Sequence, residues 1–367
     1  MNIFDEFTWE KILTLYPPRE YDIDEYFRIL SPEMPEFLEK YTNLKIMQRL
    51  KGVGLLCGTD WTNIYKNRFY YSRYQHSLAV ALIIWNFTKD KAQTLAGLFH
   101  DIATTVFSHA SDFRKGDALT QTSTEEPTAQ ILRDDEELQL LLQKDNINIE
   151  EIIDYHIYPI ADNEIPRLSA DRLEYMFPSG MALDGSWTME QIRDIYNDLI
   201  ILKNEDNTDE LGFKTLEFAE QYCFRFCMIG HLLQLNENKV TLHLLGQIMT
   251  EGVNQGILQE EDFLTLSEKQ IIDKLENACT KNRPENQKLI KYYKTFRTMT
   301  KIEHTNEPLE NHFCVNLEVK QRYINPLVKT ADGIKRVYDV SEKAKKIIDD
   351  FLSYKDTPFG CAKLISE

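Results

Sequence analysis

Two histidines and two aspartates lie close together within residues 95–112, which read LAGLFHDIATTVFSHASD. His100 and Asp101 are adjacent, and His109 and Asp112 follow in the same mostly apolar stretch. An imidazole and a carboxylate are costly to bury unless they have polar partners. Such partners could be a bound metal ion or the other histidines and aspartates of the chain.

His76 and Asp171 are the further residues that could complete such a site. His76 lies in the segment RYQHS and Asp171 in SADRLEYMF, each in an apolar helical context. Two imidazoles and two carboxylates suit one divalent transition metal (Mn, Fe, Ni, Co or Zn) better than Ca or Mg. An open coordination position on such an ion would lower the pKa of bound water and place hydroxide beside a phosphate. The alternative is that the four residues are unrelated and are satisfied by hydrogen bonds in the core.

The elements that must position these residues are predicted to be helices. A strongly apolar helix follows His76, and the next helix, starting near residue 92, is expected to contain His100 and Asp101. A helix with Ser169 as its N-cap is expected to carry Asp171. Further helices are predicted at residues 128–142, 149–158, 188–202, 211–230, 236–252, 266–280 and 288–301.

The C-terminal part of the chain has a different pattern. Apolar and polar residues alternate over residues 313–319, which predicts a strand, and Asp332 followed by Gly333 predicts a hairpin turn. A final helix is predicted over residues 341–354. Together these patterns predict a mainly α fold with additional C-terminal helices and a small β hairpin near the C-terminus.

Composition excludes several classes of function. The formal net charge of −17 argues against a surface for double-stranded nucleic acid or anionic membranes. No apolar run approaches the roughly 20 residues needed to span a bilayer, and the first residues lack the pattern of a signal peptide. A cytoplasmic protein with free thiols is therefore expected, because the six cysteines show no metal-site or disulfide-framework spacing. They are Cys57, Cys223, Cys227, Cys279, Cys314 and Cys361.

The segments RYQHS, LFHDIATTVFSH and SADRLEYMF together resemble the hallmark stretches of the HD-domain metal-dependent phosphohydrolases. Within that superfamily the closest resemblance is to the dNTP triphosphohydrolase branch, the relatives of the sterile-alpha-motif and HD-domain protein. The resemblance covers roughly residues 45–300 and implies an HD-domain helical bundle there. With the patterns on either side of it, the sequence predicts a chain of four parts. These are an N-terminal arm (1–44), a metal-binding core (45–180), a helical extension packed on the core (181–306), and a β hairpin plus C-terminal helix (307–367).

The resemblance also implies roles for individual residues. The implied metal ligands are His76, His100, Asp101 and Asp171. The implied contacts to the substrate are Arg73, Arg172 and Tyr175. His109 and Asp112 would lie near the scissile phosphate and act in catalysis with Asp101, since a histidine with a carboxylate partner can transfer a proton. The alternatives are that both arginines only pair with carboxylates, and that His109 and Asp112 are a helix cap and a loop carboxylate.

The chain departs from the pattern of that branch at three places. Thr104 and Thr124 stand where the branch has histidines, and Pro178-Ser179 stands where it has an Arg-Asp pair. His156 could partly compensate by holding a second ion with Glu125 or Glu126, the alternative being an ordinary helix position.

These observations lead to two hypotheses about function. The first is metal-dependent hydrolysis of a small phosphorylated substrate, either a nucleotide (dNTP, NTP or nucleoside monophosphate) or a related phosphate ester. The second is an HD-fold nucleotide-binding or regulatory protein that retains the metal but has lost turnover. In both cases the resemblance implies a homo-oligomer, either a dimer or a tetramer.

Overall fold

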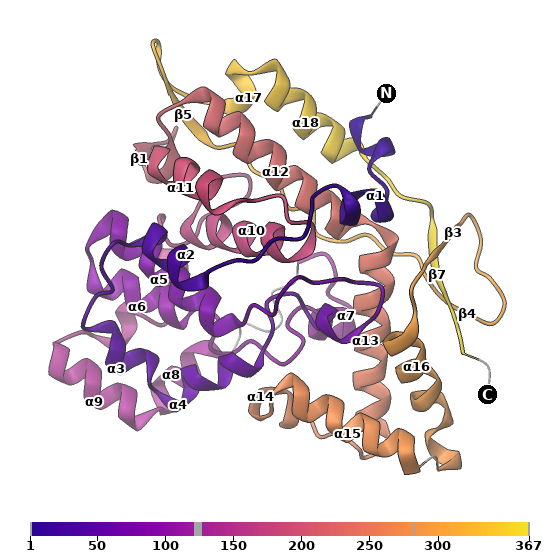
Figure 1. Ribbon diagram of the computed structural model, residues 1–367. Coiled ribbons are helices and arrows are strands. Elements are labelled where there is room, and N and C mark those ends of the chain that lie inside the picture. The colour runs from indigo at the N-terminus through magenta and orange to yellow at the C-terminus, as the bar shows by residue number, and fades with distance from the viewer. Residues whose placement is uncertain (1, 121–126, 282, 366–367) are drawn as a thin grey trace.

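A computed structural model describes residues 2–120, 127–281 and 283–365, whose arrangement is shown in Figure 1. The fold is mainly α, as the sequence predicted. Buried hydrophobic side chains from Phe4 near the N-terminus to Ala362 near the C-terminus form one cluster. All four parts predicted from the sequence therefore contribute to a common core.

The N-terminal arm is bound into this core. It consists of a 3-10 turn, η1 (Ile3–Glu6), and the short helices α1 (Trp9–Thr14), α2 (Ile23–Leu30) and α3 (Leu38–Thr42). Each element buries a large side chain, since Phe4, Trp9, Tyr26 and Leu38 are at most 5% exposed.

Three helices position the predicted site: α5 (Arg73–Thr88), α6 (Lys91–Phe99) and α10 (Ala170–Leu183). They follow α4 (Lys45–Arg49) and the 3-10 turns η2 (Leu50–Gly52) and η3 (Thr59–Trp61). Helix α5 begins with a capping box formed by Ser72 and Gln75 and then carries an unbroken buried run over residues 76–84. Such a helix is apolar on all sides because it is surrounded, and both α6 and α10 pack against it.

The prediction of a helix through His100 and Asp101 was wrong in its end point. Helix α6 ends at Phe99, His100 is its C-cap, and α7 (Ala110–Lys115) begins only after His109. Between the two helices the chain turns sharply, and Phe107 and Ser108 have positive φ angles of 63° and 47°. The apolar residues that suggested a continuing helix are part of a buried turn instead. His100 and Asp101 therefore lie at the C-terminal end of α6.

Two further helix predictions were partly wrong. Residues 128–142 are divided into α8 (Thr128–Asp134) and α9 (Glu136–Asp145), because Asp135 has extended backbone and its carboxylate accepts from Leu138 N to cap α9. Residues 149–158 form two 3-10 turns, η4 (Ile149–Glu151) and η5 (Tyr155–Ile157), which are capped by Asn148 and Asp154.

Long helices dominate the extension, with α12 (Leu216–Gln234) and α13 (Asn236–Asn254) crossing the centre of the molecule (Figure 1). The predicted helices near residues 236–252, 266–280 and 288–301 are confirmed as α13, α15 (Glu268–Lys281) and α16 (Gln287–Thr298). The helix predicted at 188–202 was wrong at its C-terminal end, and the helix predicted at 211–230 was wrong at its N-terminal end. There α11 (Met189–Asp198) is followed by β1 (Leu199–Lys203), and β2 (Asp209–Phe213) precedes α12. The remaining elements are α14 (Asp262–Thr265) and the 3-10 turn η6 (Pro284–Asn286).

Two small sheets include the C-terminal residues. The first has the order β1-β2-β5-β6 and contains the hairpin of β5 (Leu327–Thr330) and β6 (Gly333–Arg336), as predicted from Asp332 and Gly333. The second has the order β3-β7-β4, with β3 (Glu303–Thr305), β4 (His312–Val315) and β7 (Phe359–Lys363) all antiparallel. The strand predicted over 313–319 ends at Val315, where the chain leaves the sheet. Helices α17 (Val337–Val340) and α18 (Glu342–Ser353) follow the first sheet. Helix α18, which Ser341 caps, confirms the final helix predicted over residues 341–354.

One prediction about the cysteines was wrong. Cys314 on β4 and Cys361 on β7 are directly paired in register and joined by a disulfide, whereas Cys57, Cys223, Cys227 and Cys279 are free. Antiparallel pairing brings the two Cα atoms to 4.1 Å across 47 residues of chain, a proximity that spacing in sequence does not reveal.

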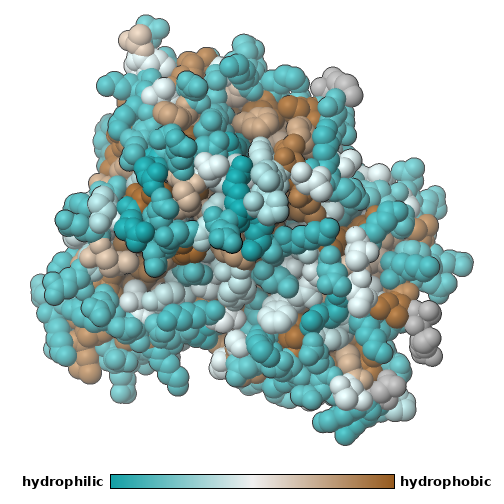
Figure 2. Space-filling model, viewed as in Figure 1, coloured by the Kyte–Doolittle hydropathy of each residue, from teal (hydrophilic) through white to brown (hydrophobic). Residues whose placement is uncertain are grey.

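Among the described residues, no helix combines the length and the apolar character needed to cross a bilayer. The face shown in Figure 2 is mostly hydrophilic, and the apolar side chains visible on it are scattered.

Candidate metal centre and its cavity

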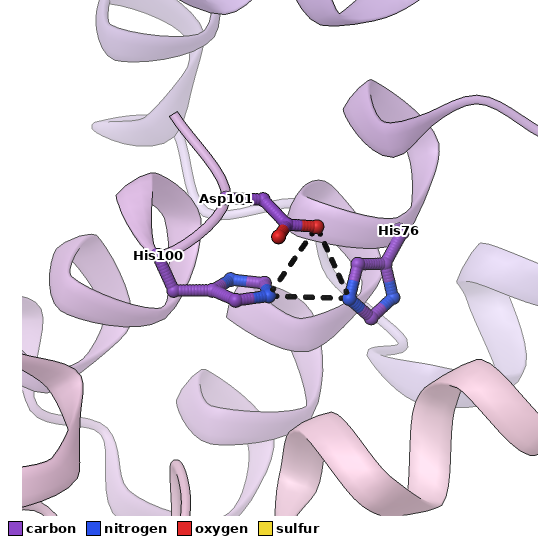
Figure 3. Close-up of side chains that lie close together, drawn as sticks. All are labelled: His76, His100 and Asp101. Carbon is purple, nitrogen blue, oxygen red and sulfur yellow. Dashed lines mark hydrogen bonds and ion pairs between the residues drawn. The ribbon is translucent and has the colours of Figure 1, made fainter. Parts of the chain in front are cut away.

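Four of the predicted ligand residues converge at one point. The Nε2 atoms of His76 and His100 lie 3.2 Å apart, and Asp101 Oδ2 lies 3.6 Å from each of them (Figure 3). Asp171 Oδ1 approaches from a separate helix, 3.0 Å from His76 Nε2 and 3.6 Å from His100 Nε2. The structure thus brings together the whole ligand set predicted from the sequence.

These separations fit a transition metal. Bonds of about 2.1 Å from a metal to nitrogen and oxygen place neighbouring ligand atoms about 3.0 Å apart in octahedral and about 3.4 Å apart in tetrahedral geometry. The observed 3.0–3.6 Å between the donor atoms lies at this scale. The residues present therefore match, in donor type and spacing, a site for one divalent ion.

The ends of helices carry these ligands. His76 lies in the first turn of α5, Asp171 in the first turn of α10, and His100 at the C-cap of α6. A carboxylate in the first turn is favoured by the partial positive charge of the helix N-terminus. Because three separate elements meet here, the site exists only in the folded chain.

Each histidine is oriented by a hydrogen bond on its other ring nitrogen. His76 Nδ1 is bonded to the carboxylate of Glu174, and His100 Nδ1 donates to the backbone oxygen of Gly97 at 2.7 Å. A proton on Nδ1 leaves the lone pair of Nε2 for a metal. Both rings therefore present the metal-binding nitrogen toward the same point.

The charges around this point favour a cation. Burial alone would lower the pKa of His76, but the carboxylates of Glu174 and Asp171 outweigh it and raise the pKa to about 10. Burial would raise the pKa of Asp101, yet Arg73 and the two histidines hold it well below its usual range. The pKa of Asp171 is also low, since hydrogen bonding to His76 overcomes its burial. The carboxylates of Asp101, Asp171 and Glu174 outnumber the guanidinium of Arg73, so the charges favour a cation at this buried point.

Asp101 has two further contacts that hold its carboxylate. Arg73 Nη1 donates to Asp101 Oδ2 at 2.7 Å, and Thr104 Oγ1 donates to Asp101 Oδ1 at 2.8 Å. Arg73 also donates from Nε to Ser108 Oγ at 3.1 Å. Thr104, which replaces a histidine expected from the resemblance, therefore anchors a predicted metal ligand in this chain.

His109 and Asp112 form a pair beside the metal ligands. His109 Nδ1 lies 2.9 Å from Asp112 Oδ2, and the side chain of Asp112 is fully buried. The other ring nitrogen, Nε2, lies 3.4 Å from Arg322 Nη2. Burial lowers the pKa of His109, and the cations of Arg322 and Arg73 lower it further against the opposing effect of Asp112. His109 is therefore a neutral imidazole at neutral pH, with Nδ1–H donating to Asp112.

One cavity of about 650 Å³ is lined by the four predicted ligands together with Arg73, His109 and Arg322. The cavity also includes Tyr175 and Arg172, the two other predicted substrate contacts. The guanidinium of Arg172 is bound to the loop before α10, with Nη2 donating to Asp162 Oδ1 at 2.7 Å and Nη1 to Asn163 O at 2.9 Å. The further lining includes the charged residues Asp162, Glu164 and Lys320 as well as apolar or neutral ones, among them Leu55, Leu56, Tyr65, Leu233, Asn238 and Leu242.

The possible second ion near His156 has less support from the geometry. His156 lines the cavity but its side chain is 52% exposed, with Nδ1 2.9 Å from Asp154 Oδ1 and Nε2 3.6 Å from Asp162 Oδ2. Among the described residues, the clusters close enough to share an ion do not include His156. Glu125, Glu126 and Thr124 lie outside the described residues, so the second ion stays a prediction.

A second cluster of potential ligands lies away from the cavity and consists of Glu237, His304 and Asp356. His304 Nε2 lies 2.9 Å from Glu237 Oε1, and its Nδ1 lies 2.9 Å from Asp356 Oδ1. Each ring nitrogen already faces a carboxylate, so a protonated histidine explains this cluster without a metal.

Two residues of the site were missed by sequence reasoning, namely Glu174 and Arg322. Glu174 stands three residues after Asp171 on the same helix, and that spacing puts both side chains on one face. This was a usable signal. Arg322 follows Asp171 by about 150 residues and no local pattern marks it.

Residues 73–211 of the chain match the HD domain family. The chain therefore contains an HD domain. The matched segment begins at Arg73, immediately before His76, and includes all four predicted ligands of the HD domain. The superfamily predicted from the sequence is confirmed, while the dNTP triphosphohydrolase branch stays a prediction.

Proteins similar over most of the chain share this fold. The uncharacterised protein YdhJ of Bacillus subtilis is 22% identical over 324 residues, which are 84% of this chain and 89% of YdhJ. A phosphohydrolase from Bacteroides thetaiotaomicron has a TM-score of 0.63 at 15% identity, covering 91% of this chain and 97% of its own. A hypothetical protein from Aquifex aeolicus has a TM-score of 0.61 at 16% identity, covering 90% and 93% respectively. These similarities cover far more of the chain than residues 73–211, so the shared fold extends beyond the HD domain.

Proposed function

We propose that this HD-domain protein is a metal-dependent phosphohydrolase that acts on a nucleotide or a related phosphate ester. The observation that carries the proposal is the convergence of His76, His100, Asp101 and Asp171 on one point inside a cavity. The fold shared with the Bacteroides phosphohydrolase supports it. A transition metal, when bound there, supplies Lewis acidity toward a phosphate oxygen and lowers the pKa of a bound water.

The chain's own residues supply the remaining functions. His109 is neutral, and Asp112 holds its Nδ1–H, so Nε2 is the atom that accepts and returns a proton. This assigns to His109 the transfer of a proton from the attacking water to the leaving oxygen. Arg73, held by Asp101 and Ser108 at the cavity wall, places a fixed positive charge beside the reacting phosphate.

The size and lining of the cavity support a nucleotide-sized substrate. A volume of about 650 Å³ falls in the range of small-molecule sites, and the lining combines cations with apolar and aromatic side chains. Tyr175 offers a ring and a hydroxyl, and Tyr65 donates to Asn238 Oδ1 at 2.9 Å elsewhere on the wall. Such a lining suits a ligand with an anionic part and a less polar part, as in nucleoside mono- and triphosphates.

The test is a substrate panel on protein loaded separately with Mn, Fe, Ni or Co. Metal content is measured by elemental analysis, and phosphate or triphosphate release is measured with dNTPs, NTPs and nucleoside monophosphates. We expect metal-dependent release that Asp101→Ala abolishes, while Asp332→Ala at the exposed hairpin turn leaves it unchanged. A protein that binds none of these metals would overturn the proposal.

A second candidate is a nucleotide-binding or regulatory protein that retains the metal site. It is favoured by Thr104, whose hydroxyl is bound to Asp101 where the resemblance expects a histidine able to contact phosphate. In the same panel, saturable nucleotide binding without release of phosphate would support this candidate over the hydrolase.

The cytoplasmic location and the homo-oligomer likewise remain proposals.

A further inference from the structure

The turn between α6 and α7, which ends at His109, is held by a buried carboxylate. Glu268, the first residue of α15, is 1% exposed and lies outside the matched HD domain. Its Oε1 accepts from Gly54 N at 2.9 Å and from Phe107 N at 3.3 Å. Its Oε2 accepts from Trp61 Nε1 at 2.8 Å. One carboxylate therefore joins three segments, namely the loop after η2, the turn η3 and the turn before His109.

The shape of the turn before His109 depends on partners outside it. Phe107 and Ser108 both have positive φ angles, a conformation that costs free energy in residues other than glycine. Val106 N donates to Phe263 O at 2.9 Å, and the next N–H group, that of Phe107, donates to Glu268. Because buried N–H groups need acceptors, α14 and α15 together stabilise the turn in this conformation.

The turn in its place holds Arg73. Ser108 Oγ donates to Gly54 O at 3.0 Å and accepts from Arg73 Nε at 3.1 Å. The two backbone N–H groups bound to Glu268 belong to Gly54 itself and to Phe107, the neighbour of Ser108. The guanidinium of Arg73 therefore depends on Ser108 for its position at the cavity wall, and Ser108 depends on the carboxylate of Glu268.

Glu268 fills this role in its ionised form. A carboxylate accepts from all three N–H donors, whereas the protonated acid would turn an O–H group toward one of them. Burial raises the pKa of Glu268 to about 7, the three hydrogen bonds oppose that rise, and the charge of Asp60 adds to it. The thiol of Cys57 and the phenol of Tyr70 also interact with Glu268, and burial raises the pKa of both. Glu268 is thus an anion above neutral pH and faces neutral donors.

We propose that Glu268 is a positioning residue for the phosphate-binding part of the site, which it holds in shape through Ser108 and the turn before His109. This inference rests on the proposed function, in which Arg73 faces the reacting phosphate and His109 transfers the proton. Glu268 is not among the described residues that line the cavity, so it acts through them. A helix that follows the HD domain in sequence thus determines the geometry of the anion subsite without touching the substrate.

Anion binding tests this assignment separately from turnover. Pyrophosphate is titrated calorimetrically into the full chain loaded with Mn at pH 8, where Glu268 is ionised, and metal content is measured before and after. We expect Glu268→Gln to bind pyrophosphate about 10-fold more weakly, because the NH2 group of its amide cannot accept from the N–H donors around it. Asp273→Asn, the same exchange at an exposed position of α15, is the matched control and should bind like wild type.

A double-variant cycle distinguishes positioning from a general loss of structure. Ser108→Ala removes the link between Gly54 and Arg73, so it should weaken pyrophosphate binding by itself. If Glu268 acts through Ser108, adding Glu268→Gln to Ser108→Ala should weaken binding by less than about threefold more. Independent losses would multiply instead, and a multiplied loss would overturn the inference.

A milder variant covers the case in which Glu268→Gln does not fold. Glu268→Asp keeps the carboxylate but shortens the side chain by one methylene, so it should bind pyrophosphate with an affinity between those of wild type and Glu268→Gln. Circular dichroism checks the fold of each variant. Pyrophosphate affinity of a folded Glu268→Gln within about twofold of wild type contradicts the assignment. The same holds for Glu268→Asp where it alone folds, and for a wild type that binds no pyrophosphate.

Kinetics with a substrate from the panel separate this inference from the hydrolase proposal. Glu268→Gln should lower kcat/KM by about 10- to 100-fold at unchanged metal content, because a small displacement of the groups around the phosphate slows the reaction strongly. If wild type shows no turnover but Glu268→Gln still binds pyrophosphate more weakly, the hydrolase proposal fails and the assignment of Glu268 stands. Turnover by wild type with kinetic constants that Glu268→Gln leaves unchanged gives the opposite result.

Discussion

Glu174 shows how one buried carboxylate prepares a metal ligand. Its side chain is fully buried and accepts from Tyr71 Oη at 2.8 Å and Tyr26 Oη at 3.1 Å as well as from His76 Nδ1. Three donors around a single carboxylate fix its position and charge. The tautomer and the direction of His76 therefore depend on a residue that does not itself reach the metal.

Replacing this carboxylate should weaken the metal site without removing a ligand. We expect Glu174→Gln to lower metal affinity by about 10- to 100-fold. The NH2 group of the glutamine amide cannot accept a hydrogen bond, so at least one of the present donors to Glu174 would lose its acceptor. Competition with a chelating dye measures the affinity, and circular dichroism checks that the fold persists. Glu285→Gln, at an exposed position, is the control. Equal affinities for a folded Glu174→Gln and wild type would contradict the role given to Glu174.

At the scale of residues, sequence reasoning succeeded where chemistry is local. Two imidazoles and two carboxylates in apolar contexts have few explanations, and the structure places their donor atoms 3.0–3.6 Å apart. The contacts of Arg73 and Arg172 with carboxylates were left as an alternative and are present. Arg322 could not be found, because only the tertiary fold brings it to the cavity wall and no short motif encodes that path.

Among the elements, the contact between α5 and α6 determines where His100 and Asp101 point. Gly97 lies in the last turn of α6, and a Cβ built there would lie 2.2 Å from Ile84 Cδ1 on α5. Ile84 is fully buried, so its side chain has little room to yield. The two helices are close enough here that only glycine fits, and the carbonyl of the same residue orients His100.

We expect Gly97→Ala to lower the free energy of unfolding. Overpacking should cost about 1–3 kcal/mol, and the better helix propensity of alanine, about 1 kcal/mol, should offset only part of that cost. Adding Ile84→Val removes the clashing Cδ1 and should restore much of the loss. Urea denaturation of both variants and of Ile84→Val alone measures the coupling between the two positions. If Gly97→Ala is as stable as wild type, or if Ile84→Val gives no rescue, the close helix contact is not what requires glycine.

Element types were predicted well where periodicity is long and poorly where apolar runs are short. The buried helix α5 and the capped helices α10 and α18 follow directly from their sequences. Residues 199–202 read LIIL, a run that fits a buried strand and a buried helix equally. Pairing with β2 decides in favour of β1, and that partner is visible only in the fold. Likewise the alternation over 313–319 continues past Val315, but the residues after Val315 leave the sheet to reach the cavity.

For the whole molecule, the disulfide is a covalent link between two strands of the β3-β7-β4 sheet. Cys314 is on the edge strand β4, and Cys361 is on the central strand β7. A cross-link over 47 residues constrains the unfolded chain by up to about 4 kcal/mol in the chain-entropy account.

Reducing agent should therefore lower the urea midpoint of wild type. The double variant Cys314→Ser/Cys361→Ser should unfold at the lower midpoint with or without reductant. Cys279→Ser, which removes a free thiol, should respond to reductant as wild type does. A wild-type midpoint that does not change with reductant would show that the link does not contribute to stability in solution.

His304 links three parts of the chain near the N-terminal end of α13. Its ring bridges Glu237 in the first turn of α13 and Asp356 before β7, and His304 itself lies on β3. Hydrogen bonds to Asp356 and Glu237 raise its pKa from an ordinary 6.5 to about 10, against the opposing effect of burial. Both carboxylates are only 5% exposed, so loss of the positive charge leaves them facing each other without compensation.

The sign of the resulting pH dependence follows from the raised pKa. A group that binds its proton more tightly in the folded state stabilises the fold fully below its unfolded pKa, here about 6.5, and this contribution is lost as pH rises through about 10. We expect wild type to lose thermal stability between about pH 7 and pH 10 more steeply than His304→Gln, which cannot titrate there. Tm measured across that range for both proteins gives the difference, which should be largest near neutral pH and should vanish toward pH 10. Because other groups that titrate at alkaline pH affect both proteins equally, a constant difference in Tm would show that His304 is not the charged link between α13 and the C-terminal sheet.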